Sequence, residues 1–179
     1  MSPVKLSHYV LQTNRIAEMR DWYRAVLDAE LVQENEHICF LTYDEEHHRI
    51  AFLNYEPLEE RTLRHTGLNH VAFSFDTLGD LLASYERLKA RGIAPHWCVN
   101  HGPTTSIYYH DPDGNGVEFE VENFATLEEC TDYMRGPDFA RNTRGFDFNP
   151  DQMLKELRAG VPERVLKDRA RLEKAVAAV

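Results

Sequence analysis

Leu6-Ser7-His8 near the start of the chain and Leu68-Asn69-His70 in its middle decide how the rest of the sequence is interpreted. Each tripeptide opens a segment with the residue pattern of a β-strand, in which successive side chains face opposite ways. The two histidines hold the same place in the two segments, 62 residues apart. This indicates an internal repeat, and an internal repeat changes the predicted fold as a whole.

Both copies continue with the same order of elements. Apolar residues recur at helical spacing over Ile16–Val26 in the first copy and over Leu78–Leu88 in the second, and three short strand-like runs follow each helix. We therefore predict an α+β fold of two tandem βαβββ modules, at about residues 4–55 and 66–122. The modules are expected to form one catalytic domain over residues 1–122, with a metal-binding cleft enclosed between their curved sheets.

The remaining residues, 123–179, break the repeat. Residues 124–150 contain Gly-Pro and Asn-Pro pairs, which interrupt regular structure, and we predict an irregular segment there. Asp151–Ala159 and Pro162–Ala178 are predicted to be C-terminal helices, because Asp and Pro suit helix starts. The apolar stripe of the last helix is expected to pack on the parent domain or on a sister subunit.

Composition excludes several classes of function. The formal net charge is −10 and the pI is about 5.3, so binding to the phosphates of a nucleic acid is not expected. No apolar run is long enough to cross a bilayer, and no targeting segment is recognised, so we expect no membrane association. The three cysteines form no CxxC pair, which argues against a disulfide framework and a thiolate zinc site. These features predict a cytoplasmic protein, and symmetric assembly into a homo-oligomer is the common case.

Three residues on predicted strands carry the candidate chemistry. His8 and His70 occupy matching places in the repeat, and Glu118 on the last strand can add a carboxylate. Two histidines and one carboxylate on one side of an octahedral ion leave three positions open, as in non-heme Fe(II) sites that react with O₂. A structural zinc site would need four ligands. Glu120 has the same strand parity as Glu118 and is the alternative carboxylate.

Two stretches of the second half resemble a known family. Leu68-Asn-His-Val-Ala-Phe73 and Asp111-Pro-Asp-Gly-Asn-Gly-Val-Glu118 are similar to segments of the vicinal oxygen chelate superfamily. Within it, the chain most resembles the type I extradiol catechol dioxygenases, in particular 2,3-dihydroxybiphenyl 1,2-dioxygenases of the short, one-domain kind, over residues 4–122. The resemblance implies ring cleavage of a catechol by O₂ at Fe(II), in aromatic compound degradation. Mn(II) uses the same ligands and is the alternative metal.

The resemblance also implies roles for three residues outside the metal triad. Asp44-Glu-Glu-His-His-Arg-Ile-Ala-Phe52 resembles the extradiol segment whose second histidine, here His48, is the active-site acid–base. Tyr108, ten residues before Glu118, matches the tyrosine that hydrogen-bonds the substrate oxygen. His101 matches a further histidine close to the substrate and O₂.

Two other functions remain as alternatives. One is another metalloenzyme of the same superfamily, such as a glyoxalase-type isomerase, which takes a fourth protein ligand from the first half; Glu56 is the candidate for that ligand. The other is a non-enzymatic protein that sequesters an aromatic compound or drug in the same cleft. Such a protein needs no metal triad.

Overall fold

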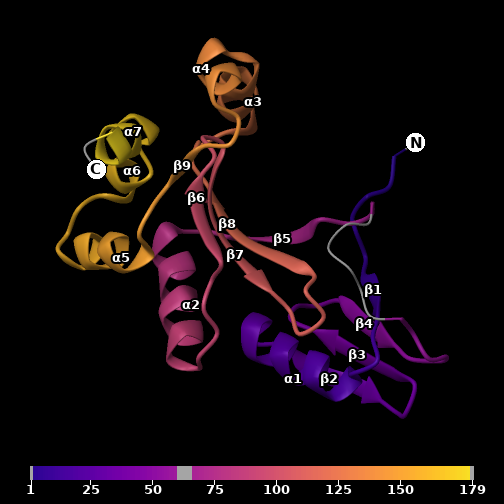
Figure 1. Ribbon diagram of the computed structural model, residues 1–179. Helices are drawn as coiled ribbons and strands as arrows, with labels where there is room; N and C mark the ends of the chain where they lie inside the picture. Colours follow the sequence, from indigo (N-terminus) through magenta and orange to yellow (C-terminus); the bar gives the residue numbers. More distant parts are fainter. Residues whose placement is uncertain (1, 60–65, 178–179) are drawn as a thin grey trace. The chain divides into compact units, whose positions relative to one another are not determined.

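The computed structural model describes residues 2–59 and 66–177. Contacts divide the chain into two compact units. The first unit comprises Met1–Leu68 and His110–Asn115, and the second comprises Asn69–Tyr109 and Gly116–Val179. Each unit contains one β-sheet, of four strands in the first and five in the second (Figure 1).

The first unit has the element order β-α-β-β-β, as predicted. Its elements are β1 (Tyr9–Gln12), α1 (Ile16–Leu27), β2 (Glu30–Glu34), β3 (Ile38–Thr42) and β4 (Ile50–Leu53). The sheet has the order β1-β4-β3-β2, with β1 parallel to β4 and the other neighbours antiparallel. Met19, Tyr23 and Val26 recur on one side of α1 and are buried, so this side of the helix faces the core.

The second unit repeats this order and then extends it. The repeated elements are β5 (His70–Phe75), α2 (Leu78–Ala90), β6 (Trp97–Asn100), β7 (Thr104–His110) and β8 (Gly116–Glu122). A short strand, β9 (Phe146–Asp147), adds to the edge, so the sheet order is β5-β8-β7-β6-β9. The first and last strands of the repeat, β5 and β8, are parallel neighbours, as β1 and β4 are. The repeat predicted from the two histidines is therefore confirmed.

The sequence of α2 explains both of its ends. Thr77 caps the first turn, because its side chain accepts a hydrogen bond from the backbone N–H of Asp80. Gly92 ends the helix with φ of +78°, a conformation that favours glycine. The N–H of Gly92 bonds to the carbonyl of Lys89, and that of Ile93 bonds to the carbonyl of Leu88. This pair of bonds is the Schellman motif, which satisfies the last carbonyl groups of the helix.

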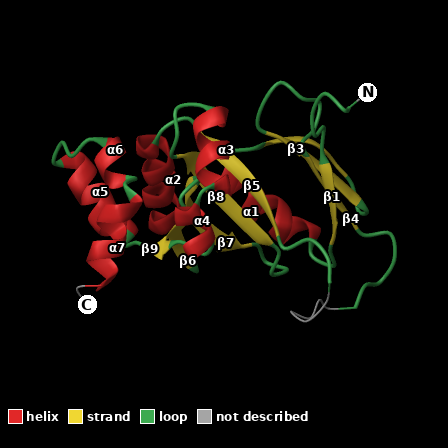
Figure 2. Ribbon diagram, turned by 90° about the horizontal axis from the view of Figure 1, so that it is seen from above, coloured by secondary structure: helices red, strands yellow, loops and turns green. Residues whose placement is uncertain are grey.

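The C-terminal helices are α5 (Pro150–Arg158), α6 (Glu163–Leu166) and α7 (Arg169–Ala177). They pack within the second unit: α5 lies against α2, and α7 lies against β9 (Figure 2). The guanidinium of Arg158 makes two hydrogen bonds to the Glu86 carboxylate. The Glu163 carboxylate accepts from the first N–H groups of α2, at Leu78 and Gly79. A carboxylate at this end of a helix stabilises it, by about 1 kcal/mol for a cap.

Two expectations for residues 123–179 were wrong in detail. The segment predicted to be irregular holds α3 (Leu127–Arg135), α4 (Pro137–Arg141) and β9. The helix predicted over Pro162–Ala178 is divided into α6 and α7 as far as Ala177, the last described residue, because Asp168 accepts a hydrogen bond from the N–H of Ala170 and starts a new helix. None of the described helices is long and apolar enough to cross a membrane.

Candidate active site

The pairing of β5 with β8 brings His70 and Glu118 together. Ala72 lies opposite Glu118 in this parallel pair, and His70 shares a face of β5 with Ala72. His70 Nε2 and Glu118 Oε2 are 2.8 Å apart. The Glu118 side chain is only 6% exposed, whereas that of His70 is 34% exposed. A buried carboxylate is costly unless a cation or hydrogen-bond donors compensate it, so Glu118 needs partners such as the His70 ring.

Gly116 permits this approach of the two strands. It pairs with His70 in the sheet, and a Cβ atom at Gly116 would lie 2.6 Å from the Asn69 carbonyl oxygen and 2.9 Å from His70 Cβ. Real Cβ atoms do not approach other atoms so closely. A side chain here would therefore push β8 away from the start of β5, where the candidate ligand His70 lies.

The Tyr108 hydroxyl continues the cluster on β7. It donates a hydrogen bond to Glu118 Oε1 at 2.7 Å, and the side chain is buried. Burial raises the pKa of Tyr108 well above its usual range, and the hydrogen bond to Glu118 and its negative charge raise that pKa further. The hydroxyl therefore keeps its proton and acts as a hydrogen-bond donor.

His101 lies on the other side of Tyr108. Its Nε2 is 2.9 Å from the Tyr108 hydroxyl, and its Nδ1 is 2.6 Å from the backbone carbonyl oxygen of Arg144. The Trp97 indole stacks on the Tyr108 ring with centroids 4.9 Å apart. The second unit thus holds a continuous run of contacts from His70 through Glu118 and Tyr108 to His101.

The rival carboxylate, Glu120, has a different partner. It lies opposite Ser74 in the β5–β8 pair, and its Oε1 accepts a hydrogen bond from the Ser74 hydroxyl at 2.9 Å. Burial raises the pKa of Glu120. The contact with the His70 ring nitrogen therefore favours Glu118 as the ligand.

His8 and His48 lie close together in the first unit. His8 directly precedes β1, and His48 lies in the loop between β3 and β4. Their ring centroids are 4.3 Å apart, and the Phe40 ring packs edge-on against His48 at 4.8 Å. Burial lowers the pKa of His48, and charge on His8 and His47 lowers it further. The His48 imidazole is therefore neutral at pH 7 and able to accept a proton.

Arg49, which the sequence did not single out, holds the two histidine-bearing segments together. Its Nε donates to both oxygens of Asp44 in the β3–β4 loop. Its Nη1 donates to the carbonyl oxygens of Leu6 and Ser7, at 2.7 and 3.0 Å, just before His8. The sequence does not indicate this role, because the two carbonyl groups that Arg49 contacts belong to residues 42 and 43 positions away in the chain.

Asn69 is a second residue that sequence reasoning missed. Its Oδ1 lies 2.7 Å from His70 Nδ1. An amide oxygen only accepts, so this contact places a proton on Nδ1 and leaves Nε2 as the ligand nitrogen when a metal is bound. Metal-binding histidines generally have such a partner on the other ring nitrogen.

The donor set fits a divalent metal, although its three members lie in different units. His70 and Glu118 meet in the second unit, and His8 lies in the first unit beside His48. In the part of the chain that is described, no three His, Cys, Asp or Glu side chains are gathered at metal-binding spacing. The complete triad of His8, His70 and Glu118 therefore stays a prediction.

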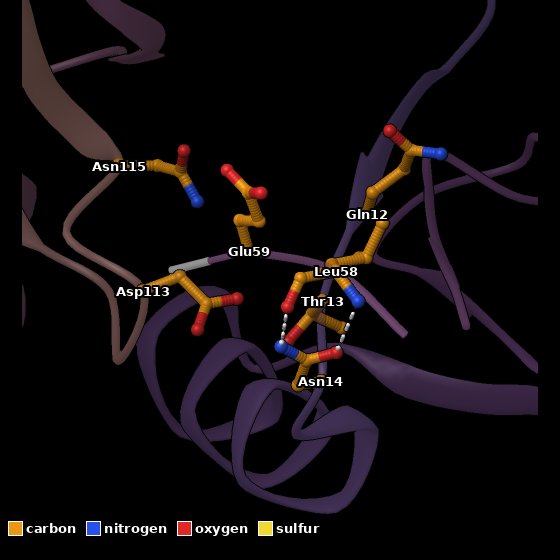
Figure 3. Close-up of a pocket in the computed structure, with 7 residues that line it drawn as sticks. All are labelled: Gln12, Thr13, Asn14, Leu58, Glu59, Asp113 and Asn115. Carbon is orange, nitrogen blue, oxygen red and sulfur yellow. Dashed lines mark hydrogen bonds between the residues drawn. The ribbon is translucent and has the colours of Figure 1, made fainter. Parts of the chain in front are cut away.

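A polar pocket in the first unit lies outside the candidate site (Figure 3). The Asn14 side chain closes one side of it, because its amide exchanges two hydrogen bonds with the Leu58 backbone. None of the residues predicted to carry chemistry lines this pocket. Its lining residues are Gln12, Thr13, Asn14, Leu58, Glu59, Asp113 and Asn115.

Comparisons with known proteins agree with this fold and with the candidate chemistry. The family model described as the glyoxalase/bleomycin resistance protein/dioxygenase superfamily matches residues 5–119. Two proteins of Rhodococcus globerulus, biphenyl-2,3-diol 1,2-dioxygenase 2 and biphenyl-2,3-diol 1,2-dioxygenase 3, are each 51% identical to the chain. The matches cover 88% and 93% of this chain and 84% and 88% of the relatives.

Solved structures share the fold at low sequence identity. The crystal structure of a lactoylglutathione lyase from Agrobacterium tumefaciens matches with a TM-score of 0.56 and 18% identity. The match covers 68% of this chain and 96% of that one. At this level of identity the likeness concerns the fold alone.

Proposed function

The chain belongs to the glyoxalase/bleomycin resistance protein/dioxygenase superfamily, and on that premise we propose that it is an extradiol dioxygenase that cleaves the ring of a catechol. A substrate such as biphenyl-2,3-diol, or a related aromatic diol, would be opened beside its hydroxyl groups with both atoms of O₂ incorporated. The observation that carries the proposal is the run of contacts from His70 through Glu118 and Tyr108 to His101. The 51% identity to two biphenyl-2,3-diol 1,2-dioxygenases supports it independently.

The metal is proposed to be Fe(II), held by His8, His70 and Glu118, with Mn(II) as the alternative ion. Two neutral imidazoles and one carboxylate suit a divalent cation, and they leave coordination positions for other ligands. When bound, Fe(II) supplies adjacent positions for the diol and O₂ and a path for electrons between them. The chain itself supplies the ligands, the proton acceptor and the hydrogen-bond donor.

His48 is the proposed acid–base residue. Its pKa is lowered by burial, so its imidazole is free at neutral pH to take a proton from a catechol hydroxyl. The resulting oxygen anion needs a hydrogen-bond donor, and the Tyr108 hydroxyl is one that keeps its proton. His101, in contact with that hydroxyl, holds it in place.

The strand register argues against a site with four protein ligands. Ala72 lies opposite Glu118 in the second unit, and Val10 lies opposite Ala51 in the first. Both Ala72 and Val10 follow a proposed histidine ligand by two residues. Ala51 is thus the first-unit counterpart of Glu118, and its methyl group cannot bind a metal. Glu56, the alternative fourth ligand, is exposed beyond the end of β4. Three ligands favour a dioxygenase over a glyoxalase-type isomerase.

The test is anaerobic reconstitution of the purified protein with Fe(II), followed by 2,3-dihydroxybiphenyl and air. We expect a yellow ring-opened product, one molecule of O₂ consumed for each diol, and two labelled oxygen atoms in the product when ¹⁸O₂ is used. The protein loaded with Zn(II) is the matched control and should form no product.

Each alternative function predicts a different result in the same assay. A non-enzymatic binding protein would bind the diol without consuming O₂. An isomerase would leave the diol intact and convert the adduct of methylglyoxal and glutathione when loaded with Ni(II) or Zn(II). Either result would contradict the proposal.

A further inference from the structure

A short segment near the C-terminus, Arg144–Asp147, lies against the residues that contact Tyr108. It includes β9, which pairs with β6 so that Phe146 lies opposite Asn100 and Asp147 lies opposite Val99. The segment is outside residues 5–119, the part matched by the family model. It belongs to the second unit, as His101 and Tyr108 do.

The backbone carbonyl of Arg144 fixes which nitrogen of His101 carries a proton. A carbonyl oxygen only accepts hydrogen bonds, and this one lies 2.6 Å from His101 Nδ1. Nδ1 is therefore protonated. In the neutral ring, Nε2 then has a free lone pair, and this is the nitrogen that lies 2.9 Å from the Tyr108 hydroxyl.

This assignment determines what the Tyr108 hydroxyl can do. The hydroxyl has one proton and two neighbouring acceptors, namely Glu118 Oε1 at 2.7 Å and the lone pair of His101 Nε2. If Nδ1 of His101 lost its partner, the ring could turn or change tautomer, and Nε2 would become a donor. The orientation of the Tyr108 hydroxyl therefore depends on the Arg144 carbonyl.

Gly145 is required for the segment to come so close. Its φ is +96°, and a Cβ atom there would lie 2.2 Å from the Asn100 carbonyl oxygen and 2.8 Å from His101 Cα. The Asn142 side chain holds the turn from the other side. It accepts a hydrogen bond from the Gly145 N–H at 2.9 Å and donates one to the Gly145 carbonyl at 3.0 Å.

The same segment also contacts Tyr108 through Trp97. The Trp97 indole N–H donates to Asp147 Oδ1 at 2.9 Å, and the Arg144 guanidinium carbon lies 5.0 Å from the indole centroid. The same indole stacks on the Tyr108 ring. Two of the neighbours of Tyr108, His101 and Trp97, are thus attached to Arg144–Asp147.

We propose that Arg144–Asp147 is a positioning element for Tyr108, which acts by holding His101 in the Nδ1-protonated tautomer and Trp97 in its stack. The proposal rests on the proposed function, because Tyr108 is taken there to be the donor to the substrate oxygen. It assigns a role in the reaction to a part of the chain that carries none of the predicted ligands. The residues of the element touch neither a proposed ligand nor the substrate, so they are not catalytic residues.

The first test is Gly145→Ala, with Gly160→Ala as the matched control. Both glycines have positive φ, +96° and +87°, but a Cβ atom at Gly160 meets nothing within 4 Å. Strain of the backbone is therefore similar, and only Gly145→Ala displaces the segment from His101. The readout is the ¹⁵N chemical shifts of the His101 ring in the metal-free protein, which report the tautomer without any activity.

We expect wild type and Gly160→Ala to show His101 protonated at Nδ1, and Gly145→Ala to lose that signature. In the Fe(II)-loaded protein, Gly145→Ala should lower kcat by roughly 10- to 100-fold, with a smaller change in KM and an unchanged iron content. Wild-type protein with Nδ1 unprotonated would overturn the inference, and so would equal losses of kcat in the two variants. The protonation of His101 Nδ1 is measured in the metal-free protein and does not depend on turnover of a catechol. Failure of this inference is therefore distinguished from failure of the proposed function.

A second variant guards against the case in which Gly145→Ala does not fold. Asp147→Ala removes the carboxylate that accepts the hydrogen bond of the Trp97 indole, and the Asp147 side chain is 54% exposed. Asp138→Ala, at an exposed residue of α4, is its control. The chain has two tryptophans, so the Trp97 indole N–H signal can be identified by NMR. We expect Asp147→Ala to shift this signal and to lower kcat, and Asp138→Ala to do neither. An unchanged kcat in Asp147→Ala together with a shifted indole signal would exclude the Trp97 part of the proposal.

Discussion

His70 Nε2 and Glu118 Oε2 lie 2.8 Å apart on adjacent parallel strands, and each side chain has a further partner on its other atom. Asn69 lies at Nδ1 of the histidine, and the Tyr108 hydroxyl donates to Oε1 of the glutamate. Under the proposed metal assignment, Nε2 and Oε2 are the two atoms that would bind the ion, because Nδ1 and Oε1 already have partners.

Glu118→Gln and Glu120→Gln should differ in metal content. Glu118→Gln replaces the carboxylate beside His70 with a neutral amide, so we expect the protein to lose most of its iron. Glu120→Gln should keep its iron, because the glutamine can still accept the hydrogen bond from Ser74. The iron content of both proteins after anaerobic reconstitution and desalting is the measurement. The reverse pattern would assign the ligand to Glu120.

His48→Gln should keep iron and lose rate. The side chain is proposed to move a proton and not to bind metal, and acid–base help of this kind is typically worth roughly 10²- to 10⁴-fold. We expect kcat to fall within that range in steady-state assays of the Fe(II) protein. His37→Gln, at an exposed histidine of the same unit, is the control. Normal turnover by His48→Gln would show that this histidine is not the acid–base residue.

Arg49→Gln should disturb the first unit at both histidines. The substitution removes the guanidinium that joins Asp44 to the carbonyls of Leu6 and Ser7, so the segment before His8 is released. We expect weaker Fe(II) binding and a lower kcat, with the fold of the chain retained by circular dichroism. Arg141→Gln, at a side chain that is 65% exposed, should change neither. If Arg49→Gln binds Fe(II) as wild type does, Arg49 has no part in placing the ligand.

Acid should weaken the docking of α5 on α2 at one defined contact. The Asp151 carboxylate accepts hydrogen bonds from Lys89 Nζ at 2.6 Å and from the Tyr85 hydroxyl at 2.9 Å. The bond from Lys89 lowers the pKa of Asp151 most, and the bond from Tyr85 lowers it further. A lowered folded-state pKa means that the stabilisation is present above the unfolded pKa of about 3.9 and is lost as pH falls through the folded value.

Asp151→Asn therefore should unfold at lower urea concentration than wild type at pH 7, and the difference should shrink below about pH 3.9. Urea unfolding followed by circular dichroism at both pH values measures it. Asp138→Asn serves as the control, because Asp138 is 77% exposed and its ion pair with Arg141 is 4.0 Å long. A difference that stays the same in acid would mean that the charge of Asp151 is not what stabilises the contact.

The fold of the repeat was predictable because its signals are local. Alternating residues around His8 and His70, and apolar residues at helical spacing after each, identified two βαβββ units without any knowledge of long-range contacts. Helix α3 was not predicted, although its start also has a local sequence signal. Thr126-Leu-Glu-Glu129 is a capping box, in which the side chains of Thr126 and Glu129 bond to each other's backbone N–H groups.

The candidate site was predictable only in part. The sequence and its resemblance identified His70, Glu118, Tyr108 and His101, and the structure brings these four into contact. The contacts that hold the site in place could not be predicted from the sequence, because they join distant positions through backbone atoms. His101, for example, contacts the backbone carbonyl of Arg144, which is 43 positions away in the chain. Every residue type has a backbone carbonyl, so the sequence cannot indicate this contact.

The central claim is that one Fe(II) is bound by a histidine from each half of the chain and by Glu118. Its most direct test is the number of Fe(II) ions bound per chain, measured by anaerobic equilibrium dialysis for wild type, His8→Ala and His70→Ala, with His37→Ala as the control. We predict one tightly bound ion for wild type and for His37→Ala, and none for the other two. Wild-type stoichiometry and affinity in either His8→Ala or His70→Ala would contradict the account.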